Sequence, residues 1–216
     1  MNKTLSVVIP AFNEAATIGS VVANAIRYGV PVVVDDGSVD NTGDVARSAG
    51  AKVIRHSVNL GYDRALDSGF ALAAELGCDY VVTMDADGQH DAEILAQFIH
   101  ALDEGAELVV GIRGRSQRVA ETIFGWVARA RWGILDPLCG MKGYRIGLYR
   151  DLGHFDSYGS IGTELAIFAA KSGRRIAQIP VKTGERSGAP RFASLIAANR
   201  RILRALWIGL RTPPRH

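Results

Sequence analysis

The chain has 216 residues and a mass of 23.2 kDa; 48% of its residues are hydrophobic and 22% are charged. This composition supports a buried core, excludes wholesale disorder and fits a single domain. The two cysteines are too few for a disulfide scaffold, and neither lies in a metal-binding motif.

The net charge of +3 is unevenly distributed. Residues 1–110 hold 6 Lys and Arg against 16 Asp and Glu, a balance of −10, whereas residues 111–216 hold 19 against 6, a balance of +13. We expect cations to bind the acidic half, and phosphates or an anionic surface to bind the basic half; solvated surface charge is the alternative. Nucleic acid is not an expected partner, because the basic half lacks interleaved aromatic side chains.

Short β-branched runs alternate with amphipathic stretches in the first half of the chain. The predicted strands are residues 5–10, 31–35, 51–56, 80–84 and 108–112. The predicted helices are residues 14–28, 41–49, 62–76 and 91–103. This alternation predicts an α/β fold, with a mostly parallel central sheet and helices on both faces.

The pattern is looser in the second half. The predicted helices there are residues 117–132, 162–171 and about 193–210, and the predicted extended segments are residues 140–145 and 176–181. We expect one domain over residues 1–190, followed by a basic amphipathic helix and tail over residues 191–216. Neither a signal peptide nor a run of about 18 apolar residues is recognisable, so we expect a cytoplasmic protein without a membrane span.

Three polar clusters follow predicted strands, at residues 10–14, 35–38 and 85–90. Ligands of open α/β sheets bind at the carboxyl ends of the strands. Asp85 and Asp87, one residue apart, can share a hard divalent cation, and Gln89 can add a neutral oxygen. Magnesium or manganese held in this way keeps positions open for a diphosphate. The Rossmann and Walker glycine patterns are absent.

The segments VVIPAFNEAATI, VVVDDGSVDNT, NLGYDRALDSGF and VVTMDADGQHD occur in that order. Together they resemble the family 2 inverting glycosyltransferases of the GT-A fold, and most closely their branch of dolichyl-phosphate-mannose synthases and polyprenyl-phosphate glycosyltransferases. The resemblance covers roughly residues 5–190. It implies that residues 1–112 bind a nucleotide sugar and a metal, and that residues 113–190 bind the acceptor.

The resemblance also implies roles for individual residues. The implied donor-binding residues are Pro10, Ala11, Phe12, Glu14, Asp35, Asp36, Arg64, Asp85, Ala86 and Arg186. The implied metal ligands are Asp85, Asp87 and Gln89. The sequence departs from the family pattern around Arg64 and in the loop that contains Arg186.

The acceptor half matches the branch more loosely. The implied acceptor-binding residues are Arg113, Arg118, Thr122 and Lys142, and the implied catalytic residues are Asp87, Arg113, Arg118 and Asp136. Asp136-Pro137-Leu138-Cys139-Gly140 is similar to the D-P-x-S-G motif of the family, with cysteine in place of serine. Arg118 and Thr122 are four residues apart, so on a helix both can reach one anion.

The type of acceptor decides which residues the reaction needs. A lipid phosphate, whose second pKa is about 6, is largely ionised at neutral pH and attacks without a general base. A hydroxyl acceptor needs a carboxylate base, for which Asp136 and Glu164 are the candidates. Because arginines outnumber spare carboxylates, we favour transfer from a UDP- or GDP-linked sugar to undecaprenyl or dolichyl phosphate.

Two other functions remain open. One is transfer to a saccharide or lipid hydroxyl during envelope polysaccharide or lipopolysaccharide assembly, and the other is a nucleotide-sugar sensor without turnover. The last predicted helix has an apolar stripe flanked by arginines. We expect it either to lie on the cytoplasmic face of a membrane or to pack on protein.

Overall fold

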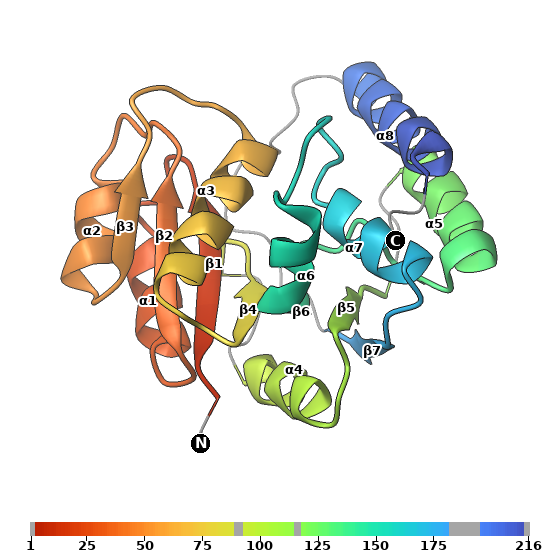
Figure 1. Ribbon diagram of the computed structural model, residues 1–216. Helices are drawn as coiled ribbons and strands as arrows, with labels where there is room; N and C mark the ends of the chain where they lie inside the picture. Colours follow the sequence, from red (N-terminus) through yellow and green to blue (C-terminus); the bar gives the residue numbers. More distant parts are fainter. Residues whose placement is uncertain (1–2, 89–92, 115–117, 182–194, 214–216) are drawn as a thin grey trace.

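Seven strands form one sheet in the computed structural model, which describes residues 3–88, 93–114, 118–181 and 195–213 (Figure 1). The strands are β1 (Leu5–Ala11), β2 (Val30–Asp35), β3 (Lys52–Arg55), β4 (Tyr80–Thr83), β5 (Leu108–Ile112), β6 (Lys142–Arg145) and β7 (Ile176–Pro180). Their order is β3-β2-β1-β4-β6-β5-β7. Strand β6 runs antiparallel to β4 and β5, and all other pairs are parallel, which confirms the predicted mostly parallel sheet.

The helices cover both faces of this sheet. They are α1 (Ile18–Ala25), α2 (Thr42–Ser48), α3 (Tyr62–Glu75), α4 (Ile94–Asp103), α5 (Val119–Trp132), α6 (Ile146–Leu152), α7 (Glu164–Lys171) and α8 (Leu195–Arg211). Because side chains alternate along a strand, Val7 and Ile9 pack with α1 and α4 while Val8 packs with α3. Helices α5 to α8 belong to the same core as α3.

Most predicted elements are found with small shifts of their ends, but one predicted helix is markedly shorter and one helix was not predicted. The predicted helix over residues 14–28 is shorter, because Thr17 N donates to Glu14 O in a turn before α1 begins. Helix α6 was not predicted, because seven residues with a glycine in second place give little periodicity. Glycine 153, with a φ of 84°, ends α6.

The amphipathic helix α8 packs on the domain. Its buried apolar side chains are Ala198, Ile202, Ala205 and Leu206. Arg201 Nη2 donates to Asp63 Oδ2 at 2.8 Å, and Lys171 Nζ donates to Gly209 O at 2.6 Å. Among the helices of the described residues, none is long and apolar enough to cross a membrane.

Candidate active site

The turns after β1 and β2 are tied together at the carboxyl edge of the sheet. The strands are in register through Ala11 opposite Asp35, so both turns leave the sheet at the same level. Asn13 N donates to Ser38 Oγ at 2.9 Å, and Val39 N donates to Asn13 Oδ1 at 3.0 Å. Asn13 has a φ of 56°, a left-handed conformation that asparagine tolerates well. The first two predicted clusters therefore form one rigid surface.

Asp35 is fully buried, and its two carboxylate oxygens differ. Oδ1 accepts the backbone N–H of Ser38 at 3.0 Å. Oδ2 accepts no hydrogen bond from the part of the chain that the structure describes, and it lies 3.5 Å from Nε of the half-exposed Arg55. A Cβ at Gly43 would lie only 2.6 Å from Oδ2, so glycine keeps the space beside this oxygen open. A buried, unsatisfied carboxylate oxygen is costly unless a ligand donates to it.

Asp36 has its oxygens occupied by the protein. They accept the backbone N–H groups of Leu60 at 2.9 Å and Gly61 at 2.8 Å, and Oδ1 lies 2.7 Å from Nδ1 of His56. Nε2 of His56 lies 3.0 Å from Oγ of Ser68 on α3. Asp36 thus fixes the segment that leads into α3, a contact that the sequence did not reveal.

The remaining donor-side residues lie around these turns. Pro10 and Ala11 are buried at the end of β1, whereas Phe12 is 44% exposed beside them. Glu14 Oε2 accepts a hydrogen bond from Thr17 Oγ1 at 3.1 Å. Arg64 is exposed on the first turn of α3, and the predicted residues Arg186 and Gln89 lie outside the described residues.

The acidic cluster follows β4, the neighbour of β1. Ala86 and Asp87 are buried and Asp85 is partly buried. A Cβ at Gly140 would lie 2.4 Å from Asp85 Oδ2, so the loop after Asp136 approaches this carboxylate as closely as glycine allows. Thr83 Oγ1 donates to Gly140 O at 2.6 Å and holds the two segments together.

The carboxylates of Asp85 and Asp87 suit a magnesium or manganese ion. Both are hard oxygen ligands on one short segment at the edge where the donor-side turns meet. Within the described ranges, no group of three or more His, Cys, Asp and Glu side chains could hold a metal. Two carboxylates leave coordination positions for other oxygens, such as those of a diphosphate.

Arg113 and Asp136 form a bidentate ion pair. Arg113 donates to Asp136 through Nε and Nη2, both at 2.8 Å, and through its backbone N at 3.0 Å. Burial disfavours the Asp136 carboxylate, but the hydrogen bonds and charge of Arg113 outweigh burial and lower the pKa of Asp136. The same pair raises the pKa of Arg113 against the effect of burial. An ionised, bidentate carboxylate of this kind is a poor general base.

Arg118 joins this pair through a residue that the sequence analysis missed. Arg118 precedes α5, and its Nη1 donates to Oε1 of the buried Glu121 at 3.0 Å. Oε2 of Glu121 lies 3.6 Å from Nη2 of Arg113. The i, i+3 spacing of Arg118 and Glu121 is the signal that could have revealed this contact. Thr122 Oγ1 donates to Arg118 O at 3.4 Å.

Lys142 is buried beneath the loop that approaches Asp85. Its Nζ donates to Cys139 O at 2.6 Å and to Gly162 O at 3.2 Å. Burial lowers the pKa of Lys142 and raises the pKa of the Cys139 thiol to about 11. The thiol therefore stays protonated, and Lys142 joins Cys139 to the loop before α7.

That loop contains a second left-handed residue, Ile161, with a φ of 59°. A β-branched residue there is strained, and strain of this kind gathers at functional sites. Gly162 N donates to Asp63 Oδ1 at 2.7 Å, and Asp63 also binds Arg201 of α8. Burial and the charge of Asp156 raise the pKa of Asp63.

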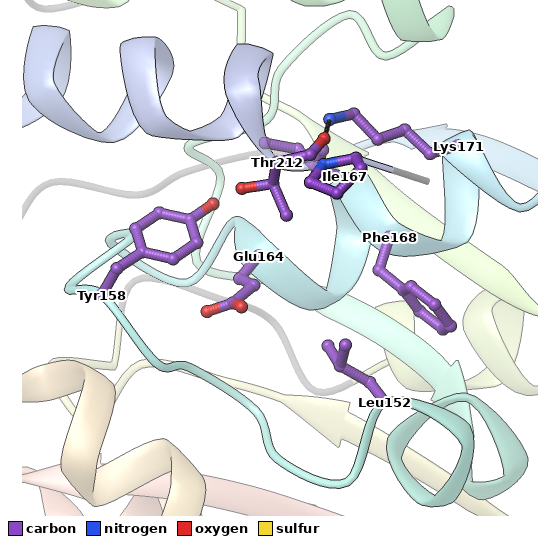
Figure 2. Close-up of a pocket in the computed structure, with 8 residues that line it drawn as sticks. Leu152, Tyr158, Glu164, Ile167, Phe168, Lys171 and Thr212 are labelled. Atoms are coloured by element: carbon purple, nitrogen blue, oxygen red, sulfur yellow. Dashed lines mark hydrogen bonds between the residues drawn. The ribbon is translucent and has the colours of Figure 1, made fainter. Parts of the chain in front are cut away.

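Glu164 faces a small cavity under the end of α8. The cavity has a volume of about 20 Å³, and Tyr158 and Lys171 also line it (Figure 2). Glu164 accepts the N–H of Ser157 at 2.5 Å, and Nε2 of His154 lies 3.1 Å from its Oε1. This cavity has room for about one water molecule and is too small for a sugar.

Comparison with known proteins identifies the family. The sequence model described as "Glycosyl transferase family 2" matches residues 6–150. The chain belongs to glycosyl transferase family 2. This membership confirms the resemblance inferred from the ordered motifs and identifies the chain as a glycosyltransferase.

Individual relatives agree with this assignment. The chain is 34% identical over 199 residues to a dolichyl-phosphate hexose transferase of Haloferax volcanii, covering 85% of this chain and 84% of the relative. It is 30% identical over 235 residues to an undecaprenyl-phosphate mannosyltransferase of Micrococcus luteus, covering 94% and 96%.

The fold also matches solved glycosyltransferases. A glucosyl-3-phosphoglycerate synthase from Mycobacterium tuberculosis, crystallised with Mg²⁺ and uridine diphosphate, superimposes with a TM-score of 0.80 at 27% identity. The match covers 98% of this chain and 81% of that structure. The predicted GT-A fold of this glycosyltransferase is confirmed.

Proposed function

We propose that this glycosyltransferase moves a sugar, with inversion, from a UDP- or GDP-linked donor to undecaprenyl or dolichyl phosphate. The observation that carries the proposal is the state of the two candidate bases. Asp136 is held as a carboxylate by Arg113, and Glu164 is bonded to Ser157 beside a cavity too small for a sugar. A phosphate acceptor needs neither residue as a base. Relatives named for dolichyl and undecaprenyl phosphate support the same acceptor.

On the donor side, we assign the nucleoside to the surface formed by the turns after β1 and β2. Asp35 Oδ2 is a buried acceptor that a nucleobase N–H would satisfy. The exposed ring of Phe12 can pack against the base or ribose, and Pro10, Ala11 and Glu14 shape this turn. We assign Asp36 a positioning role, since its oxygens bind the chain before α3. Arg64 and Arg186 remain proposed contacts to the donor phosphates.

Asp85 and Asp87, with Gln89, would hold the Mg²⁺ or Mn²⁺ ion, and Ala86 would bring the backbone close to the diphosphate. When bound, the ion offsets the negative charge that develops on the leaving diphosphate. Solved neighbours contain Mg²⁺ or Mn²⁺ together with uridine diphosphate, which supports a divalent cation.

On the acceptor side, Arg113 and Arg118 would orient the lipid phosphate, helped by Thr122. A phosphate oxygen attacks the anomeric carbon as the bond from that carbon to the diphosphate oxygen breaks. The bonding electrons leave with the nucleoside diphosphate, and no proton is transferred. Both arginines already face carboxylates, so the phosphate would compete with Glu121 for Arg118. Lys142, bonded to Cys139 and Gly162, would support this site by holding its loops.

A lipid acceptor implies work at a membrane surface. Helix α8 has a buried face that fixes it to the domain and an exposed face with Leu203, Trp207 and Leu210. We propose that this exposed face contacts the membrane, at its cytoplasmic side. The helix would lie along the interface rather than cross the bilayer.

A matched pair of acceptors tests the proposal. A panel of UDP- and GDP-sugars is incubated with a short-chain polyprenyl phosphate or with the corresponding polyprenol, in Mn²⁺ or in excess chelator. We expect one donor to give lipid-linked product with the phosphate in Mn²⁺ only. Equal or preferential transfer to the polyprenol would overturn the choice of acceptor, and full transfer in chelator would overturn the metal assignment.

A further inference from the structure

Glu121 is a buried acid in the first turn of helix α5. Its side chain is 6% exposed and lies between the two arginines assigned to the acceptor phosphate. Oε1 accepts a hydrogen bond from Arg118 Nη1 at 3.0 Å, and Oε2 lies 3.6 Å from Arg113 Nη2. An acid in the first turn stabilises a helix, but it does so equally well when exposed. Helix stability therefore does not account for the position of Glu121 between two guanidinium groups.

The charges around Glu121 are balanced. The two positive groups are the guanidinium groups of Arg113 and Arg118, and each side chain is 20% exposed. The two negative groups are the carboxylates of Glu121 and Asp136. Asp136 is fixed to both the side chain and the backbone of Arg113, whereas Glu121 bridges the two arginines. A phosphate that reaches both arginines must therefore come close to the carboxylate of Glu121.

The charge of the acceptor changes during the proposed reaction. A polyprenyl phosphate carries a charge of about −2 at neutral pH. One of its oxygens gives an electron pair to the anomeric carbon, and the bond from this carbon to the diphosphate oxygen breaks with its electrons. The acceptor becomes a phosphodiester with one negative charge, and the leaving nucleoside diphosphate gains the other. The acceptor phosphate therefore loses negative charge on the way to the transition state.

Arginines without a carboxylate would oppose this change. Positive charge beside the phosphate stabilises the bound dianion more than the less negative transition state, so it tightens binding and slows the attack. A carboxylate in the same place has the opposite effect. It weakens binding of the dianion, and the repulsion is relieved as the attack proceeds. Little water reaches this site to screen either effect, because the four charged side chains are mostly buried.

From this arrangement we propose that Glu121 keeps the acceptor phosphate reactive by offsetting the charge of Arg113 and Arg118. Glu121 is a positioning residue, since it acts through the arginines and forms no bond to the sugar. The inference rests on the proposed phosphate acceptor. It gives a signature that a structural role does not. Loss of a residue that only held the arginines in place would raise KM and lower kcat, whereas loss of the Glu121 charge should lower both.

Kinetics of Glu121→Gln with a short-chain polyprenyl phosphate test this signature, because glutamine keeps the shape of the side chain and removes its charge. We expect the KM for the acceptor to fall about tenfold and the single-turnover rate at saturating acceptor to fall about threefold. Glu75→Gln is the matched control, since Glu75 is exposed at the end of α3. A KM that stays the same or rises, or a single-turnover rate that does not fall, would overturn the proposal.

A matched pair of ligands tests the electrostatic cause by calorimetric titration. One ligand is the short-chain polyprenyl phosphate, and the other is its methyl ester, whose phosphate carries a single negative charge. Because Coulomb energy is proportional to the charge of the ligand, Glu121→Gln should bind the phosphate about tenfold more tightly and the methyl ester only about threefold. Equal changes for the two ligands, or weaker binding of both, would overturn the electrostatic role. Glu121→Asp withdraws the carboxylate by one methylene and should show the same changes at smaller size, which provides the test should Glu121→Gln not fold.

The wild-type protein separates this inference from the proposed function. Transfer by the wild type to the polyprenol rather than to the polyprenyl phosphate would overturn the proposed function itself. Transfer by the wild type to the phosphate, with KM and single-turnover rate unchanged in Glu121→Gln, would overturn only the role of Glu121.

Discussion

The proposed donor half (residues 1–112) and the proposed acceptor half (residues 113–190) are built in different ways. In the donor half, polar residues follow parallel strands and their carboxylates accept hydrogen bonds from backbone N–H groups, as Asp35 does from Ser38 and Asp36 from Leu60 and Gly61. In the acceptor half, the two arginines Arg113 and Arg118 are held by carboxylates, as Arg113 is by Asp136. A polar turn after a strand can be recognised in the sequence. The ion pairs of the acceptor half, by contrast, are visible only in the folded structure.

This difference predicts different consequences of mutation. Changes in the donor half should alter donor or metal binding with little loss of stability, apart from Asp36. Changes to the charge network of the acceptor half should reduce stability and activity together. The following variants test this contrast, beginning with the largest expected effect.

Asp87→Asn should reduce turnover by about a thousandfold or more, because a bound cation contributes several kcal/mol to a transition state with developing charge. The fold should be retained. Initial rates across a Mn²⁺ titration measure the turnover, and circular dichroism checks that the fold is retained. Asp44→Asn is the control, since the Asp44 side chain is 67% exposed on α2. A turnover within a few-fold of wild type would remove Asp87 from the metal site.

Asp136→Asn should lower the free energy of unfolding by about 3 kcal/mol at neutral pH, because it leaves the mostly buried Arg113 without its ionic partner. The pKa of Asp136 in the folded protein is below its ordinary value of 3.8. The contribution of the Asp136 carboxylate to the free energy of unfolding is therefore complete above pH 3.8. It is lost as the pH falls through the lower pKa of the folded protein.

Urea denaturation at pH 7 and at strongly acid pH checks both parts of this prediction. The difference between wild type and Asp136→Asn should be present at pH 7 and should vanish at acid pH. Asp151→Asn breaks the more exposed pair with Arg174 and should cost less than about 1 kcal/mol. Similar losses for the two variants would contradict the structural importance of the Arg113–Asp136 pair.

Gly140→Ala should reduce turnover by about tenfold and raise the Mn²⁺ concentration required, because the new methyl group would displace the Asp85 carboxylate. Rates over a Mn²⁺ series measure both effects. Gly147→Ala is the control: this α6 glycine has nothing within 4 Å of an added Cβ. If both variants behaved like wild type, the approach of Gly140 to Asp85 would have no functional role.

Asp35→Asn and Asp36→Asn should separate binding from positioning. Asp35→Asn should raise the KM for the donor about fivefold with a smaller change in kcat, because the nucleobase loses a charged acceptor. Asp36→Asn should lower stability by about 2 kcal/mol, since three hydrogen bonds meet at its carboxylate. Steady-state kinetics measures the effect of each variant on donor binding, and urea denaturation measures its effect on stability. The opposite pattern would exchange the two roles.

The sequence predicted the parts of this protein that depend on local pattern. The β-branched runs predicted the strands, and the polar turns that contain Asn13, Asp35 and Asp85 follow the neighbouring strands β1, β2 and β4. Strand β6 was predicted only as an extended segment, because its antiparallel place between β4 and β5 depends on long-range pairing. The short helix α6 lacks the length over which a helical period becomes visible.

Contacts between distant residues could not be predicted. Nothing in the sequence shows that Lys142 is buried between Cys139 and Gly162, or that Arg201 binds Asp63, 138 residues away. The amphipathic pattern of residues 193–210 allowed packing on protein or on a membrane. The structure shows that α8 packs on the domain through one face and leaves the other exposed, so the two expectations are compatible.

The central claim is that the acceptor phosphate attacks without a protein base. The dependence on pH of kcat/KM for a short-chain polyprenyl phosphate, which reports the ionisation of the free acceptor, tests this claim most directly. We predict a rise in rate with an apparent pKa of about 6, set by the second ionisation of the acceptor phosphate and unchanged in Glu164→Gln. A rise that disappears or moves in Glu164→Gln would show that a protein carboxylate takes the proton and would contradict the account.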